Sequence, residues 1–441
     1  MLEAGFARVD VTPPLGTPVM GYFEKRYAEG ILDPLELNAL AVRSGEDTVV
    51  IITGDFTGVP RVEALRYRGL IAEETGLPIE CIFYQSVHQH TSAKPGKNAW
   101  VDELYQEMLC RKFCDVAKMA ISDLSDAHLS FAEGEPKEPV AFVRRFRMKD
   151  GTTRTNPGCL NPDIDHALDV ADNTVRLVKF QREGKKDIAL VGFQNHPDMI
   201  GGRKLSADWP GFVRRMTEER IPDVHCILVN GCQGDVNHYD VTRENPAKGH
   251  KKNTPEWLEL RYAFCRKVGA ILTDAVVDLW DRTETVEAEG VYAKEEVKFF
   301  MTRFDGVERM EECKALYKSM MAGGPEAKLP LDDRGEISRI AHLDEKDLYM
   351  KIPVSLVAFG KIAILGYGGE PFTEYAVKVR ESVPEIHLLT ACLANGSEGY
   401  LPSVSAFGEG GYEARSTNFP PELPTVLQDT AKKMLAEYLG K

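Results

Sequence analysis

Short apolar runs alternate with segments of helical periodicity along most of the chain. The β-branched run TVVIITGD at residues 48–55 predicts a strand, and residues 61–75 carry apolar side chains at helical spacing. Residues 101–124 show the clearest amphipathic pattern, with apolar positions three and four apart. This alternation predicts an α/β fold in which mixed, twisted β-sheets are flanked by helices.

Capping residues predict where two further helices begin. Thr254 is a good N-cap and Pro255 a good first helical residue, so a long helix is expected to run from there to about Trp280. A second helix is expected after an apolar strand, with Pro371 as its first residue and Glu370 as its N-cap.

Residues 282–350 are less regular than the rest of the chain. An alternating, strand-like stretch at 289–300 is followed by a short helix near 310–321 and then by a loop rich in Pro, Asp and Gly. No internal repeat or composition break divides the sequence. We therefore expect a single domain over residues 1–441, with 282–350 as the candidate insertion or subdomain.

Composition narrows the class of protein. The chain has 441 residues, 43% hydrophobic and 28% charged, which is ordinary for a globular protein. Its net charge of −14 argues against nucleic acid or an anionic membrane as partner. No apolar run reaches the roughly 18 residues of a membrane span. Without a basic and apolar leader, and with nine scattered cysteines, a cytoplasmic protein is expected. The oligomeric state stays open.

Several strand-like runs end on a residue able to bind a metal. CIFYQSV stops at His88, with His90 two residues on and therefore on the same face of an extended chain. IALVGFQN stops at His196, and IAILGYGG stops at Glu370. Ligands bind outside the carboxyl ends of strands in open α/β sheets. Imidazoles with a carboxylate suit zinc, so the sequence predicts a metallohydrolase whose partner is a small-molecule substrate.

Each feature taken alone has an ordinary explanation. A histidine that ends a strand is more often a hydrogen-bonded surface residue, and NHPDMIGG reads as a turn. The Gly-rich NGCQGDVNH at 230–238 either exposes N–H groups to an oxyanion or is a plain turn. Asp55 is equally a histidine-orienting carboxylate or a helix cap. Cys110 and Cys114 are expected to be packing residues.

Read together, these stretches resemble the N-terminal catalytic domain of the neutral/alkaline (non-lysosomal) ceramidase family. The matching motifs occur in the family's order between positions 5 and 413: GFARVDVTPPLGTPVMGY, VHQHTSAKPG, FQNHPDM, NGCQGDVN, GGEPFTEY, EGYLPSV and GGYEA. The resemblance implies a ceramidase-like catalytic domain and a zinc ion held by His88, His196, Glu370 and Tyr400.

The resemblance also implies accessory residues. His90 would be a catalytic or substrate-orienting group beside the metal, and Tyr412 falls where the family has a second active-site tyrosine. The family's active-site arginine corresponds to Arg144, with Arg145 as the near alternative. Apart from the resemblance, we expect Arg145 and the Gly-rich turn, through Gly234, Asp235 and Asn237, to supply polar substrate contacts.

This sequence departs from the family pattern in its substrate-facing parts. Asn237 stands where the family carries a serine important for catalysis. TSAKPG replaces a more glycine-rich stretch. We also expect this protein to lack the family's C-terminal immunoglobulin-like domain. These departures point away from ceramide itself.

The sequence therefore predicts a zinc-dependent hydrolase of an amide C–N bond, with water as nucleophile and a small soluble amide as substrate. Three alternatives stay open. They are a hydrolase of ceramide or another N-acyl lipid, an ester or lactone hydrolase using the same site, and a non-catalytic metal-containing binding protein.

Overall fold

The computed structural model describes residues 2–93, 95–96 and 103–441. Within this part of the chain the largest sheet has nine strands in the order β16-β14-β13-β8-β1-β5-β6-β7, with β18 paired to β8. These strands are β1 (Leu2–Asp10), β5 (Glu36–Ser44), β6 (Asp47–Gly54), β7 (Ile82–Ser86), β8 (Ser125–Gly134), β13 (Val175–Arg182), β14 (Asp187–Phe193), β16 (Val224–Asn230) and β18 (Glu284–Thr285).

A second sheet has the order β19-β20-β21-β23. Its strands are β19 (Val291–Met301), β20 (Tyr349–Phe359), β21 (Ile362–Tyr367) and β23 (His387–Ala391). The two sheets face each other, because one buried cluster joins Phe83 and Val178 of the large sheet to Val357 and Leu389 of the small one. Both sheets are mixed: β6–β7, β14–β16 and β21–β23 are parallel pairs, whereas most others are antiparallel. The predicted mixed α/β class is confirmed.

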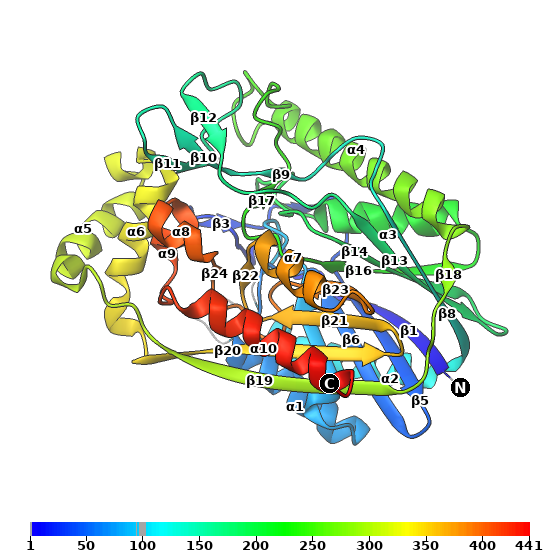
Figure 1. The fold of residues 1–441 in the computed structure, drawn as a ribbon. Coiled ribbons are helices and arrows are strands. Elements are labelled where there is room, and N and C mark those ends of the chain that lie inside the picture. The colour runs from blue at the N-terminus through cyan, green and yellow to red at the C-terminus, as the bar shows by residue number, and fades with distance from the viewer. Residues whose placement is uncertain (1, 94, 97–102) are drawn as a thin grey trace.

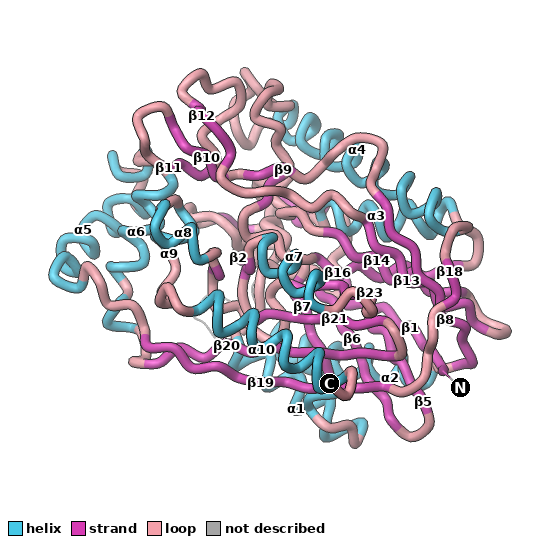
Figure 2. Tube along the Cα trace, viewed as in Figure 1, coloured by secondary structure: helices cyan, strands magenta, loops and turns pink. Residues whose placement is uncertain are grey.

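Helices cover both outer faces (Figures 1 and 2). On the large sheet, α1 (Arg61–Thr75) and α2 (Glu103–Ser122) pack on one half, and α3 (Asp208–Arg220) and α4 (Pro255–Trp280) on the other. On the small sheet lie α7 (Thr373–Ser382) and α10 (Leu423–Tyr438). The result is four layers: helices, sheet, sheet, helices.

The remaining strands have two to four residues, and the remaining α-helices have five to twelve. They are β2 (Pro18–Val19), β3 (Arg26–Tyr27), β4 (Gly30–Ile31), β9 (Phe142–Val143), β10 (Arg145–Met148), β11 (Thr153–Thr155), β12 (Ile164–Ala167), β15 (Lys204–Leu205), β17 (Val236–Asn237), α5 (Met310–Met321), α6 (Leu331–Ala341), β22 (Glu370–Pro371), β24 (Tyr400–Leu401), α8 (Val404–Glu409) and α9 (Tyr412–Ser416). None of the helices in the described residues is long and apolar enough to cross a bilayer.

Helix α4 confirms the capping prediction, since Thr254 Oγ1 accepts a hydrogen bond from the Trp257 N–H. The expected helix at 101–124 is present as α2, although residues 101–102 lie outside the described part, as does Lys94 of the TSAKPG stretch. The expected strand at 289–300 and helix at 310–321 are present as β19 and α5.

Two local predictions are wrong. Glu370 is not an N-cap: Glu370 and Pro371 stay extended because they pair with Tyr400 and Leu401 in the parallel β22–β24 bridge. Helix α7 therefore begins at Thr373, whose N–H donates to Asp235 Oδ1 at 2.8 Å. The segment expected to be a Pro-, Asp- and Gly-rich loop contains helix α6, which packs against α5 and α9.

Candidate metal centre

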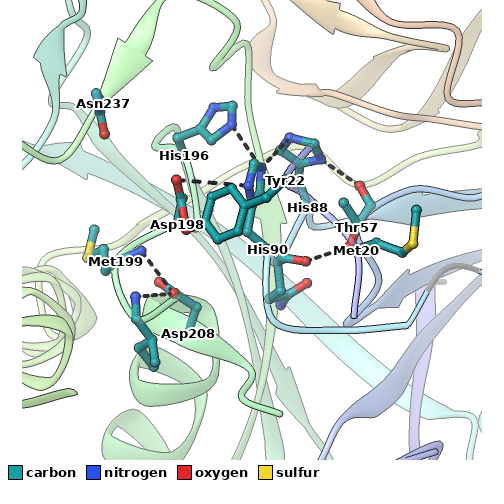
Figure 3. Close-up of polar contacts among 12 residues, drawn as sticks. Met20, Tyr22, Thr57, His88, His90, His196, Asp198, Met199, Asp208 and Asn237 are labelled. Atoms are coloured by element: carbon teal, nitrogen blue, oxygen red, sulfur yellow. Dashed lines mark hydrogen bonds and ion pairs between the residues drawn. The ribbon is translucent and has the colours of Figure 1, made fainter. Parts of the chain in front are cut away.

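Three buried histidines meet at the carboxyl ends of parallel strands (Figure 3). His88 and His90 follow β7, and His196 follows β14. His90 Nε2 lies 3.1 Å from His88 Nε2 and 3.1 Å from His196 Nε2. One ring nitrogen from each lies within 4.8 Å of the others, and no second group of this kind was found among the described His, Cys, Asp and Glu residues. This cluster is the candidate metal centre.

Glu370 joins the cluster from the small sheet. It follows β21, and its Oε2 lies 3.1 Å from His88 Nε2. Gln233 Nε2 donates to the same oxygen at 3.3 Å. The structure thus brings together His88, His196 and Glu370, the three strand-end residues that the sequence places far apart.

The protonation of His88 tests whether a metal fits this site. Its Nδ1 lies 2.5 Å from the Thr57 carbonyl oxygen, which only accepts hydrogen bonds, so Nδ1 carries the hydrogen. A neutral His88 then directs the lone pair of Nε2 at the Glu370 carboxylate. Two electron-rich atoms at 3.1 Å require a cation, either a proton on Nε2 or a metal ion. An imidazole that donates its other N–H to a carbonyl is also the usual metal ligand.

Backbone strain marks the same residue. His88 has a φ of +83°, in the left-handed region that residues other than glycine rarely adopt. Its N–H donates to the Phe56 carbonyl at 3.0 Å, which holds the strained conformation in place. Such strain persists only where the surrounding packing maintains it, and strained residues are concentrated at functional sites.

Burial and neighbouring charges set the ionisation of the cluster. Burial, followed by the charge on His88, lowers the pKa of His90 well below its usual range, and burial together with Arg144 does the same for His196. For His88, burial acts against the charged form, but the Glu370 carboxylate outweighs it and raises the pKa. The His88 ring in turn outweighs burial at Glu370 and lowers that pKa. His90 and His196 are therefore neutral, as metal ligands must be.

Arg144 is held against the cluster by a buried ion pair. Its Nε lies 2.7 Å from Glu413 Oε1, and its Nη2 donates to the Gly234 carbonyl at 2.6 Å. Nη1 lies 3.3 Å from His196 Nδ1. Arg145, the sequence alternative, points elsewhere: its guanidinium pairs with Asp169 at 3.0 Å and with carboxylates of the α8–α9 region.

The two tyrosines flank Arg144. Its guanidinium carbon lies 5.1 Å from the Tyr400 ring centroid, and the Tyr400 and Tyr412 rings are 5.4 Å apart. Burial, followed by the charge on Glu370, raises the pKa of both phenols well above the usual range. Their hydroxyls therefore stay protonated in the protein without a bound metal and are able to donate hydrogen bonds.

The residues of the Gly-rich turn have different positions. Asn237 faces the cavity, and its Nδ2 donates to Asn156 Oδ1 at 2.7 Å. Asp235 points away and caps α7. The N–H of Gly234 is already paired with the Pro371 carbonyl at 2.8 Å, so it is not free to hold an oxyanion.

Asp55 fits neither sequence interpretation. It forms a buried ion pair with Arg214 at 2.6 Å, and it accepts a hydrogen bond from Gln89 Nε2 at 2.8 Å. Gln89 lies between His88 and His90, so Asp55 supports the histidine segment indirectly.

Gly234→Ala is expected to disturb the metal centre from the backbone side. A Cβ atom at this position would lie 2.4 Å from the Glu370 carbonyl oxygen, so the strand that carries Glu370 has to move. We expect metal affinity to fall roughly 10- to 100-fold, the range seen for changes to supporting residues. Titration with zinc under competition from a chelator measures this. Gly408→Ala is the control, because a Cβ there meets nothing within 4 Å. Equal affinities in the two variants would contradict the packing argument.

A cavity of about 450 Å³ opens onto the cluster. It exposes the predicted His88, His90, His196, Glu370, Tyr400, Tyr412, Arg144 and Asn237. The wall also contains residues that the sequence reasoning did not identify: Tyr22, Phe23, Glu24, Asn156, Asp198, Lys252, Leu331 and Arg334.

Two of these residues could have been identified from the sequence. Tyr22 and Asp198 lie inside stretches already singled out, GTPVMGY and FQNHPDM, and the Tyr22 hydroxyl donates to Asp198 in the structure. Arg334 could not, because it belongs to α6, which was expected to be a loop.

Comparison with known proteins shows which solved structures have a similar fold. The sequence matches no protein-family model and no curated protein. The structure is similar to a neutral ceramidase from Pseudomonas aeruginosa, with a TM-score of 0.71, 15% identity, and coverage of 99% of this chain and 74% of that one. It is also similar to a ceramidase complexed with C2, with a TM-score of 0.68, 16% identity, and coverage of 99% and 75%. The ceramidase-like fold expected from the sequence is confirmed.

Proposed function

We propose that this protein is a zinc-dependent hydrolase of amide C–N bonds. The observation that carries the proposal is the convergence of His88, His196 and Glu370 from three strand ends onto one cavity, beside hydrogen-bond donors that a purely structural metal would not need. The ceramidase-like fold supports it, since the similar structures are described as ceramidases.

His88, His196 and Glu370 would form three positions of the zinc shell. Two residues compete for the fourth. The sequence resemblance favours Tyr400, whereas the geometry also favours His90, because ligands about 2.0–2.1 Å from a tetrahedral zinc lie roughly 3.3 Å apart. The His90 nitrogen lies 3.1 Å from those of His88 and His196. Zinc at this position supplies a Lewis acid that lowers the pKa of a water to about 7 and polarises a carbonyl.

The residues around the cluster have matching roles. Tyr412 donates its hydroxyl hydrogen to the oxygen of the scissile carbonyl as negative charge develops on it. Arg144, kept charged by Glu413, stabilises the same charge. His90, where Tyr400 is the fourth ligand instead, is neutral; it would accept a proton from the attacking water and donate it to the leaving amine. Asn237 has no nucleophilic hydroxyl, so water is the nucleophile.

The cavity wall favours a small, soluble amide over a membrane lipid. Beyond the cluster it presents the charged and amide side chains of Glu24, Asn156, Asp198, Asn237, Lys252 and Arg334, beside the rings of Tyr22 and Phe23 and the side chain of Leu331. A site for two acyl chains needs a long apolar slot, whereas placed polar groups select a polar substrate. The fold similarity favours an N-acyl lipid, so ceramide is the competing substrate.

A substrate panel tests the proposed function. Purified protein loaded with zinc is offered small N-acyl amides, the matching esters and ceramide, with and without a chelator. We expect hydrolysis of a small amide that stops on chelation and returns when zinc is added. Hydrolysis that survives complete removal of metal would contradict the proposal. Turnover of ceramide at about 10⁴ M⁻¹s⁻¹ or above would contradict the substrate class.

Tyr412→Phe should separate chemistry from metal binding. The variant keeps the ring but loses the hydroxyl, so zinc content should be unchanged while turnover falls roughly 10²- to 10³-fold, as for an oxyanion donor. Steady-state kinetics and elemental analysis on the same preparation measure both. Wild-type turnover in this variant would remove Tyr412 from the mechanism.

A further inference from the structure

Arg334 presents an uncompensated positive charge to the cavity. Its Nε is buried and makes no hydrogen bond, and no carboxylate of the described residues forms an ion pair with it. The other two cations of the wall differ. Arg144 pairs with Glu413 at 2.7 Å, and Lys252 pairs with Glu24 at 2.8 Å. Among these three cations of the cavity wall, Arg334 is the one without a carboxylate partner in the described residues, and a charge-assisted hydrogen bond to a ligand would satisfy its buried Nε.

Helix α6 places Arg334 directly beside the proposed oxyanion donor. Gly335 packs against Tyr412 so closely that a Cβ there would lie 2.6 Å from Tyr412 Cδ2. Phe23 bridges the same two residues: its ring centroid lies 5.4 Å from the Arg334 guanidinium carbon and 6.5 Å from the Tyr412 ring. The free guanidinium is therefore a neighbour of the group that would contact the scissile carbonyl.

A second cavity continues beyond Arg334. It has a volume of about 910 Å³ and shares Asn156, Leu331 and Arg334 with the first. Its other walls are mainly polar, with Lys149, Arg154 and several aspartates. Asp332 in this cavity forms its ion pair with Arg154, at 3.6 Å. Arg334 therefore stands at the junction of the two cavities.

We propose that Arg334 binds a carboxylate of the substrate, and that the substrate is an amide carrying that carboxylate within a few bonds of the scissile C–N bond, as in an N-acyl amino acid. This inference rests on the proposed amide hydrolysis and names its substrate class. Guanidinium presents a planar fork of N–H donors that matches a carboxylate with two parallel hydrogen bonds. The carboxylate would satisfy the buried donor and compensate the charge.

Matched substrates test the proposal. N-acetylglycine carries the carboxylate, and N-acetylglycinamide is its neutral counterpart. The zinc-loaded wild type should prefer N-acetylglycine in kcat/KM, and Arg334→Gln should lower kcat/KM for it roughly 10- to 100-fold, the worth of a hydrogen bond to a charged group. N-acetylglycinamide should be affected little. Arg334→Lys, which keeps the charge without the fork, should restore part of the preference.

Lys149→Gln is the control variant. It removes a positive charge from the second cavity without touching Arg334, so it should leave the preference unchanged. If Lys149→Gln and Arg334→Gln lowered kcat/KM for N-acetylglycine equally, the effect would come from the overall positive charge of the cavities rather than from a binding residue. That result would overturn the proposal. A uniform loss on both substrates in Arg334→Gln would do the same, because that result indicates a structural role.

Binding measured without catalysis separates this inference from the proposed function. Calorimetry on metal-free protein should show N-acetylglycine binding more tightly than N-acetylglycinamide, with the difference lost in Arg334→Gln. If that result holds while no amide is hydrolysed, the function is wrong and the carboxylate site stands. If the wild type binds neither compound, or binds both equally, the carboxylate site is wrong whatever the enzyme hydrolyses.

Discussion

His196→Ala is expected to lose most bound zinc and nearly all amide hydrolysis while the fold stays intact. His196 is the cluster residue that the large sheet supplies through β14, and its removal leaves the Arg144 guanidinium beside an incomplete shell. Catalysis should fall on the order of 10³-fold or more, because both metal activation and oxyanion stabilisation depend on this shell. The loop beyond the strand carries the residue, so the core of the sheet is not disturbed.

Elemental analysis and kinetics on the same preparation measure both losses. His250→Ala is the matched control, because His250 is an exposed loop residue. That control should keep full zinc occupancy and activity. Full occupancy in His196→Ala would show that the metal does not use this histidine.

Glu413→Ala is expected to have the largest effect on stability. Glu413 is fully buried and lies 2.7 Å from Arg144 Nε and 3.8 Å from Arg145 Nε. It also accepts a hydrogen bond from the Thr155 hydroxyl at 2.7 Å. Truncation would leave two buried guanidinium groups without this partner, which should lower the free energy of unfolding by about 3–5 kcal/mol.

Urea denaturation measures this difference. Glu311→Ala is the control, because it also removes a carboxylate beside a cation, Lys314. Glu311 is 83% exposed, and exposed ion pairs contribute about 0–1 kcal/mol. Unfolding of both variants at the same urea concentration would show that the buried pair does not stabilise the protein.

Local periodicity and capping predicted much of the fold. The helix at 61–75 and the helix from Pro255 to Trp280 are present with those bounds. The start of α7 was wrong because its cap comes from Asp235, more than a hundred residues earlier in the chain. Helix α6 was missed because Pro, Asp and Gly weaken its local signal, and its packing against α5 and α9 determines it instead.

The residues of the candidate site also divide into those that the sequence predicts and those that only the structure identifies. His88, His196 and Glu370 were found because each follows an apolar strand, and strand ends gather at one edge of a sheet. The choice between Arg144 and Arg145 needed the structure, since adjacent residues on an extended chain face opposite ways. Arg334 could not be predicted, because the contact between α6 and Tyr412 arises only from tertiary packing.

Anomalous diffraction at the zinc absorption edge tests the central claim most directly. Crystals of the wild-type protein prepared with zinc should show a single strong peak in the cavity, about 2.0–2.2 Å from nitrogens of His88 and His196 and from an oxygen of Glu370. The same map would decide whether Tyr400 or His90 completes the shell. A cavity without a peak in zinc-containing crystals, or zinc bound only elsewhere on the protein, would contradict the metal centre and the hydrolase built on it.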